Sequence, residues 1–188
     1  MRTRLEPLLC AVALLVGCGE DPVPKPRGYF RIDLPEQTYQ PWDSGHGLRA
    51  EMPTAARVAE RKAEGDARWF DVRYKSLRAT VHLTWSPVNG QMASLIEDAH
   101  VFKGTHGVKA RRIGHERVLR DSARVFGTIF DVDGDVASPM VFYLTDSTDN
   151  FLYGALYFDA RPNADSLAPV TERIRADMRH MAATLQWR

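Results

Sequence analysis

The residues whose spacing could hold a metal ion are the alternating acids of Asp131-Val132-Asp133-Gly134-Asp135. A calcium loop of the EF-hand type continues such a start with Gly at its sixth position and Glu at its twelfth. Here those positions hold Val136 and Phe142, so the ligand set is incomplete. Because Asp-Gly is also a strong turn signal, we interpret the stretch as a turn between two strands. We expect no metal and no other cofactor.

Histidines and serines are the other residues that could do chemistry. No histidine belongs to an HExxH pair, and His82 alternates with apolar residues, which places it on the polar face of a strand. No serine stands in a GxSxG elbow, and no glycine-rich phosphate loop follows a predicted strand. A Ser–His–Asp set assembled in space stays open as an alternative. We therefore predict that the protein is not an enzyme, with a periplasmic hydrolase as one alternative and a small-ligand carrier as another.

The strongest chemical signal is Cys18. Arg2 and Arg4 precede an apolar run from Leu8 to Val16, which is shorter than the roughly 20 residues that span a bilayer. Its length is typical of the apolar region of a secretory signal, roughly 7–15 residues. The run ends in Leu15-Val16-Gly17-Cys18, which is similar to a bacterial lipobox. This resemblance implies that the cysteine takes a diacylglyceryl group and, after cleavage, further acylation such as palmitate.

The chain accordingly divides into three parts. Residues 1–17 are expected to be a lipoprotein signal peptide, and residues 18–28 the lipidated cysteine with a proline-rich tether. Polyproline II, at about 3.1 Å per residue, would keep this tether extended. Residues 29–188 are long enough for a single domain with its own core. Membrane lipid is thus an expected partner through Cys18, whereas a net charge of +1 without a basic run argues against nucleic acid.

Periodicity predicts the elements of this domain. A weak alternation over 29–34 indicates a first strand, and residues 43–68 are expected to be loop with one short strand near 48–52. From Trp69 onward, period-two patterns predict six strands. They span residues 69–75, 79–85, 111–119, 123–132, 141–145 and 151–158. The last two are apolar on both faces, which is typical of central strands.

Two helices complete the pattern. Apolar residues at helical spacing predict a helix from Met92 to Phe102, ended by Gly104. A second helix begins near Asp165, its expected N-cap, with Pro169 in the first turn. Its expected apolar face is Leu167, Val170, Ile174, Met178, Met181 and Leu185, and its expected solvent face is Glu172, Arg173, Arg175, Asp177 and Arg179. Trp187 is expected to fold back onto the sheet. The fold class is therefore α+β, a mostly antiparallel sheet of about six strands with two packing helices, in an order similar to the PsbP and Mog1 proteins.

Several segments in order along the chain carry a resemblance to a family. They are Pro24-Lys25-Pro26-Arg27-Gly28-Tyr29, Leu34-Pro35, Tyr39, residues 77–85 with Pro87-Val88, residues 134–138, residues 142–147, Leu156-Tyr157-Phe158, residues 162–166 and Leu185-Gln186-Trp187. With them the chain is similar to the GldD gliding-motility lipoproteins of Bacteroidetes-type bacteria. The resemblance implies an accessory role in gliding, a link to type IX secretion, and other envelope proteins as partners. It supplies no catalytic residues.

The resemblance also raises three local expectations. Relatives carry two cysteines around residues 43–68 where this chain has none, so a local disulfide is absent. Ser138, Asp146, Ser147 and Ser166 lie in the matching patches and form a candidate partner surface if they gather at one edge of the sheet. Gly19 stands where inner-membrane retention requires Asp, and Glu20-Asp21 is similar to acidic surface-export signals. We expect the outer membrane, with the periplasmic face preferred to the cell surface.

Overall fold

The structure is a computed structural model that describes residues 33–188 apart from 63–64 and 107–108, with residues 102–106 described in their backbone alone. The predicted signal peptide over 1–17, the tether over 18–28 and most of the first predicted strand lie outside the described residues. The end of that predicted strand, residues 33–34, is not in a strand.

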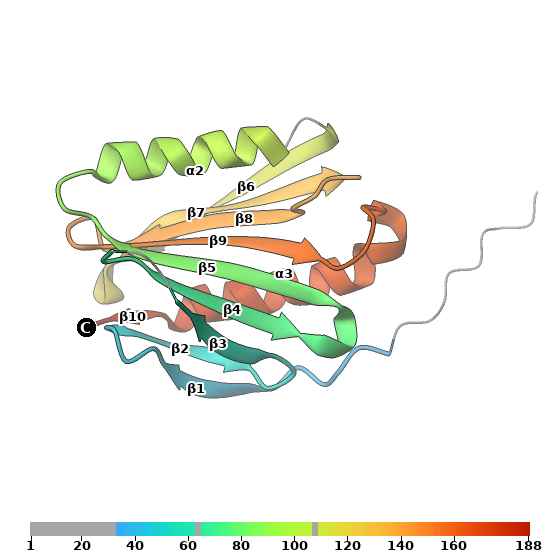
Figure 1. The fold of residues 1–188 in the computed structure, drawn as a ribbon, viewed down its shortest axis with the longest axis horizontal. Helices are drawn as coiled ribbons and strands as arrows, with labels where there is room; N and C mark the ends of the chain where they lie inside the picture. The colour runs from blue at the N-terminus through green and yellow to red at the C-terminus, as the bar shows by residue number, and fades with distance from the viewer. Residues whose placement is uncertain (1–32, 63–64, 107–108) are drawn as a thin grey trace, which may run out of the picture. The chain divides into compact units, whose positions relative to one another are not determined.

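A seven-stranded antiparallel sheet forms the centre of the domain, with the order β3-β4-β5-β9-β8-β7-β6 (Figure 1). Its strands are β3 (Arg57–Arg61), β4 (Arg68–Tyr74), β5 (Ala79–Pro87), β6 (Ala110–Arg120), β7 (Val125–Gly134), β8 (Met140–Thr145) and β9 (Asn150–Phe158). The links β4–β5 and β6–β7 are single 3-10 turns, η2 (Lys75–Leu77) and η4 (Asp121–Ala123). These short links explain the antiparallel neighbours. Strands β3 and β6 form the two edges of the described sheet.

A second, three-stranded sheet has the order β1-β2-β10. Its strands are β1 (Tyr39–Asp43), β2 (Leu48–Pro53) and β10 (Gln186–Trp187). Strand β10 pairs with β2, so the C-terminal end of the chain returns to the start of the domain. Trp187 does fold back, but onto this small sheet, and its indole nitrogen donates to the carbonyl of Arg124 at 2.9 Å.

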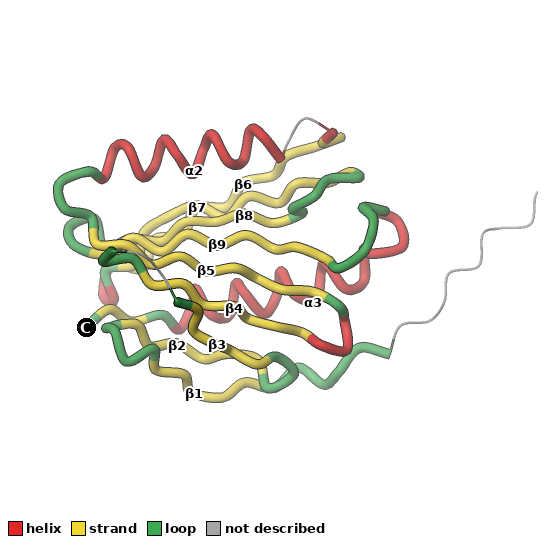
Figure 2. Tube along the Cα trace, viewed as in Figure 1, coloured by secondary structure: helices red, strands yellow, loops and turns green. Residues whose placement is uncertain are grey.

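The two long helices, α2 (Met92–His106) and α3 (Ala164–Thr184), pack on opposite faces of the large sheet (Figure 2). Helix α3 shares the main core with β2 and with one face of the large sheet. Among its apolar residues Ile174, Met178 and Met181 are fully buried, because a 3.6-residue period keeps them on one face. Helix α2 covers β8 and β9 through a smaller cluster that includes Ala99 and Phe151.

The structure confirms the α+β class and the antiparallel pairing, but the described chain contains ten strands in two sheets rather than about six in one. The region 43–68 holds β2, as expected near 48–52, and also β3, which was expected to be loop. Helix α2 does not end at Gly104 but continues to His106. Strand β7 runs to Gly134, so Asp131 and Asp133 lie in a strand and not in a turn.

Helix α3 differs from its prediction at its start and on its polar side. Its N-cap is Asn163, whose side chain accepts from the backbone N–H of Ser166, and Asp165 lies inside the first turn. Pro169 is interior to the helix, beyond the first turn. The expected solvent face is partly wrong, since Asp177 is fully buried and Arg175 is 5% exposed. Both are held by partners that come from other elements, as described below.

Candidate functional site

The four residues of the expected partner surface lie in two places. Ser138 precedes β8 and Asp146 follows it, so a whole strand separates them. Ser138 is fully buried, and its hydroxyl donates to the carbonyl of Met140 at 3.0 Å. Ser166 lies in the first turn of α3. The structure therefore does not bring Ser138, Asp146, Ser147 and Ser166 together on one edge.

Asp146 organises the turn between β8 and β9. Its Oδ1 accepts from the backbone N–H groups of Thr148, Asp149 and Asn150, each at 2.9 Å, and its Oδ2 accepts from the Asn150 side chain at 2.7 Å. Burial raises the pKa of Asp146, but these hydrogen bonds outweigh it and bring the pKa to about 2. Ser147 is exposed and has a positive φ of 67° in the same turn. The turn geometry fully accounts for the Asp146 carboxylate.

The alternating acids near residue 131 contact α3. Arg175 lies 3.1 Å from Asp131 and 3.1 Å from Asp133, and it donates to the carbonyl of Pro139 at 2.7 Å. The Arg175–Asp131 contact is an ion pair by distance, although its Nε and Oδ1 are not aligned as a hydrogen bond. Asp135 accepts from the backbone N–H of Ala164. Within the described residues no group of three or more His, Cys, Asp or Glu could hold a metal ion.

A cluster of charged side chains lies on the α2 side of the large sheet, beyond the part that α2 covers. It consists of Asp71 with Arg61, Arg73 and His82, and we call it the Asp71 cluster. The antiparallel register places Asp71 directly opposite His82, and Arg61 on the neighbouring edge strand. The Asp71 carboxylate contacts Arg73 at 2.7 Å, Arg61 at 3.0 Å and His82 Nδ1 at 2.7 Å.

The negative and positive groups of this cluster differ in their exposure to solvent. The Asp71 side chain is 3% exposed, whereas those of Arg73 and Arg61 are 57% and 44% exposed. Burial raises the pKa of Asp71, but the hydrogen bonds from Arg73 and His82 outweigh it, so the pKa lies below its usual value. One ionised carboxylate therefore anchors two guanidinium groups that remain open to solvent. Such groups suit carboxylate or phosphate ligands, because a planar fork can donate two parallel hydrogen bonds.

Aromatic rings border the Asp71 cluster. The Arg61 guanidinium stands 5.3 Å from the ring centre of Trp69, which is a cation–π distance. On the other side the His82 and Tyr157 rings are 5.5 Å apart. The surface thus combines positive charge with flat apolar rings, a combination that is common at protein–protein interfaces.

This cluster was not predicted from the sequence, although the alternation of polar and apolar residues indicates part of it. Asp71, Arg73 and His82 all fall on the polar positions of two strands that a short link joins. The register of that hairpin, which brings Asp71 opposite His82, depends on the exact turn, η2. Arg61 could not be added because β3 was expected to be loop.

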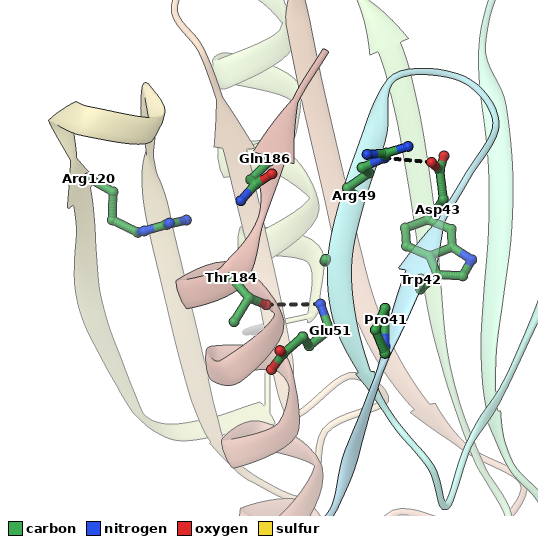
Figure 3. A pocket seen from close by; sticks show the side chains of 9 residues that line it. Pro41, Trp42, Asp43, Arg49, Glu51, Arg120, Thr184 and Gln186 are labelled. Carbon is green, nitrogen blue, oxygen red and sulfur yellow. Dashed lines mark hydrogen bonds and ion pairs between the residues drawn. The ribbon is translucent and has the colours of Figure 1, made fainter.

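A cavity lies elsewhere, between the small sheet and the end of β6 (Figure 3). It has a volume of about 530 Å³ and is lined by Pro41, Trp42, Asp43, Arg49, Ala50, Glu51, Arg120, Thr184 and Gln186. Its charged groups are already engaged, since Arg49 pairs with Asp43 at 2.6 Å and Arg120 donates to the carbonyls of Ala182 and Leu185. The cavity has the volume of a small-ligand site, and four charged residues stand among its otherwise largely apolar walls.

Among the described residues no helix is long and apolar enough to span a bilayer.

The family model described as gliding motility lipoprotein GldD matches residues 19–187. No curated protein matches the chain. The family match begins directly after Cys18 and covers both sheets and both long helices of the described domain. The chain therefore belongs to the gliding motility lipoprotein GldD family.

Proposed function

We propose that this protein is a lipid-anchored, non-enzymatic module that binds other proteins of the gliding motility and type IX secretion machinery. Acylated Cys18 would fix it to the outer membrane, with the domain on the periplasmic side. Membership in a family of gliding motility lipoproteins supports the anchor and the motility role. The lipobox-like sequence ahead of Cys18 supports the same anchor independently.

The observation that carries the binding role is the part of the large sheet that α2 leaves open. Helix α2 packs over β8 and β9, while the same face of β3, β4 and β5 carries the Asp71 cluster together with Trp69. Two solvent-exposed guanidinium groups are held there in fixed positions by a buried carboxylate. A rigid charged face suits recognition of another macromolecule, because little side-chain freedom is lost on binding.

The hydrolase alternative finds two of the three members of a Ser–His–Asp triad at the same place. Asp71 holds Nδ1 of His82, as the acid of a triad orients its histidine. The serine on the same face of β5 is Ser86, four residues from His82 along the strand. At about 3.3 Å per residue this separation is about 13 Å, which is beyond hydrogen-bond reach. The geometry of β5 therefore favours the binding role over hydrolysis.

The small-ligand alternative rests on the 530 Å³ cavity. Because its walls carry Arg49, Asp43, Glu51 and Arg120, it would suit a polar ligand better than a lipid. A thermal-shift screen of the soluble domain with sugars and amino acids would test this role. A stabilisation that Trp42→Ala removes would favour it.

The proposed function is tested by cross-linking in native membranes, followed by identification of captured proteins by mass. We expect envelope proteins of the gliding and secretion machinery. Cys18→Ala should move the protein from the membrane to the soluble fraction and remove these cross-links. Retention of Cys18→Ala in the membrane, or the absence of any captured protein, would contradict the proposal. Protease treatment of intact cells should leave the domain uncut if it faces the periplasm.

A further inference from the structure

The β3 edge of the sheet carries more positive charge than the neighbouring residues neutralise. In the β3–β4 register Arg57 lies directly opposite Arg73, so the two side chains share one face of the sheet. Like charges in directly opposed positions destabilise a sheet. Arg57 is exposed and makes no hydrogen bond or ion pair that the structure describes. An outside anion would relieve this repulsion.

The acids of strands β3 and β4, Glu60 and Asp71, are both in ion pairs. Asp71 contacts Arg61, Arg73 and His82 at once. Glu60 alternates with Arg61 along β3 and therefore points to the other face, where it lies 3.2 Å from His46. Arg61 and Arg73 share the single carboxylate of Asp71, and Arg57 has no described ion pair, so this face of β3 and β4 carries two formal positive charges in excess.

The geometry of edge strand β3 favours an extended polypeptide segment as the ligand. Strand β3 is an edge of the described sheet, and an edge strand presents main-chain groups that a further strand can pair with. Arg57 and Arg61 lie four residues apart on one face, about 13 Å at 3.3 Å per residue. A strand added alongside would point every second side chain to the same face. Acidic residues at such positions would meet Arg57 and Arg61.

We propose that β3 is the docking site for an extended acidic segment of a partner protein, which adds to the sheet as a further strand and sets carboxylates against Arg57 and Arg61. The inference rests on the proposed function, since it names the chemistry of the partner for the open face. A second copy of this chain does not fit. An antiparallel β3–β3 pair centred on Ala59 would oppose Arg57 of one copy to Arg61 of the other.

The test uses the full chain in its native membrane, with a photoreactive amino acid in place of Ala59, between the two arginines. A second probe replaces Leu119, which is 59% exposed on the opposite edge strand β6. We expect the probe at 59 to capture a protein segment with acidic residues at alternate positions. Adding Arg57→Glu should reduce this capture at least about fivefold, the effect of about 1 kcal/mol of lost ionic attraction.

A matched control separates charge from folding. Arg117 is an exposed arginine on β6 that, like Arg57, has no described hydrogen bond or ion pair. Arg117→Glu should leave capture at 59 unchanged, and neither variant should melt below the parent, since Arg57→Glu sets opposite charges against each other at Arg73. A synthetic peptide of the captured segment should bind the purified domain, with Kd raised at least about fivefold by Arg57→Glu and not by Arg117→Glu.

The outcomes are distinguishable from those of the proposed function. Capture at 59 that resists Arg57→Glu, or capture there of lipid, of a segment without acids or of a second copy, would overturn docking at β3. Capture of a partner at 119 but not at 59 would overturn docking at β3 and leave the binding role intact. Capture of no protein at either position would contradict both.

Discussion

The carboxylate of Asp177 in α3 accepts a hydrogen bond from the Tyr74 hydroxyl of β4 at 3.1 Å, and both side chains are buried. Tyr39 also donates to Asp177 at 3.1 Å, and Arg173 lies 3.3 Å away on the preceding helical turn. Burial and the nearby Asp177 raise the pKa of Tyr74 above its usual range, so its hydroxyl remains a donor. One carboxylate thus joins the small sheet, the large sheet and α3.

We expect Asp177→Ala to lower the free energy of unfolding by about 3 kcal/mol, because it leaves the buried Tyr74 hydroxyl without an acceptor and the Arg173 guanidinium without its carboxylate. Tyr74→Phe should cost about 1 kcal/mol, since it removes one hydrogen bond and keeps the ring. Urea unfolding measures both. Asp165→Ala on the same helix, where the side chain is 69% exposed, should stay within about 0.5 kcal/mol of the parent. Equal losses for Asp165→Ala and Asp177→Ala would contradict this account.

The Asp146 turn predicts a pH dependence. The pKa of Asp146 is about 2 in the folded protein against 3.8 for a free aspartate side chain, so the folded state binds this proton less readily. A depressed folded-state pKa contributes stability above pH 3.8, and this contribution is lost as the pH falls from about 4 to about 2. Asp146→Asn should therefore cost about 2 kcal/mol at pH 7 and much less near pH 2. Unfolding curves of parent and variant across this range should converge; parallel curves would count against the assignment.

Two glycines are required by packing. A Cβ at Gly154 would enter the ring of Phe142, its direct neighbour on β8, and a Cβ at Gly127 would meet the carbonyl of Tyr143. We expect Gly154→Ala and Gly127→Ala to cost about 1–3 kcal/mol each. Gly114 on β6 provides the control, because its nearest neighbour to an added Cβ is 3.9 Å away. Gly114→Ala should be neutral or stabilise by about 0.5 kcal/mol. Melting temperatures of the three variants test this, with Gly154→Ala and Gly127→Ala expected to melt below Gly114→Ala.

Arg120 closes the C-terminal end of α3. Its Nη1 donates to the carbonyls of Ala182 at 3.0 Å and Leu185 at 2.8 Å, where the helix has free acceptors and a negative dipole end. Arg120→Ala should cost about 1–2 kcal/mol in chemical denaturation. Arg117→Ala, three residues earlier on the same strand, should change stability by less than about 0.5 kcal/mol. A large loss of stability in Arg117→Ala would show that removing any arginine from β6 destabilises the domain, and would contradict a specific role of Arg120 at the end of α3.

The sequence predicted those elements whose periodicity is strong. Strands β4 to β9 and the apolar face of α3 follow patterns of aromatic and aliphatic residues, and their approximate positions are confirmed. Strand β3 was missed because Arg57-Val58-Ala59-Glu60-Arg61 is short, charged and only partly buried, as an edge strand usually is. The Asp71 cluster was missed with it, since one of its arginines comes from that strand.

The polar side of α3 shows a second limit of prediction from sequence. Arg175 and Asp177 were expected in solvent because charged residues usually are. Their partners are Asp131, Asp133, Tyr39 and Tyr74, which come from distant parts of the chain. Only tertiary structure brings these groups together, so helical periodicity alone could not place the two residues inside. The N-cap moved from Asp165 to Asn163 for a local reason, because both residue types cap helices well.

The chain enters the described domain through a segment that is fastened to α3. The Arg173 guanidinium donates to the carbonyl of Pro35 at 2.6 Å, and Gln37 and Tyr39 reach Asp177. A mechanical pull on the N-terminal side would therefore load these bonds before it could peel β1 from β2. Tension along this segment would pass through Asp177 into α3 and, through Tyr74, into β4.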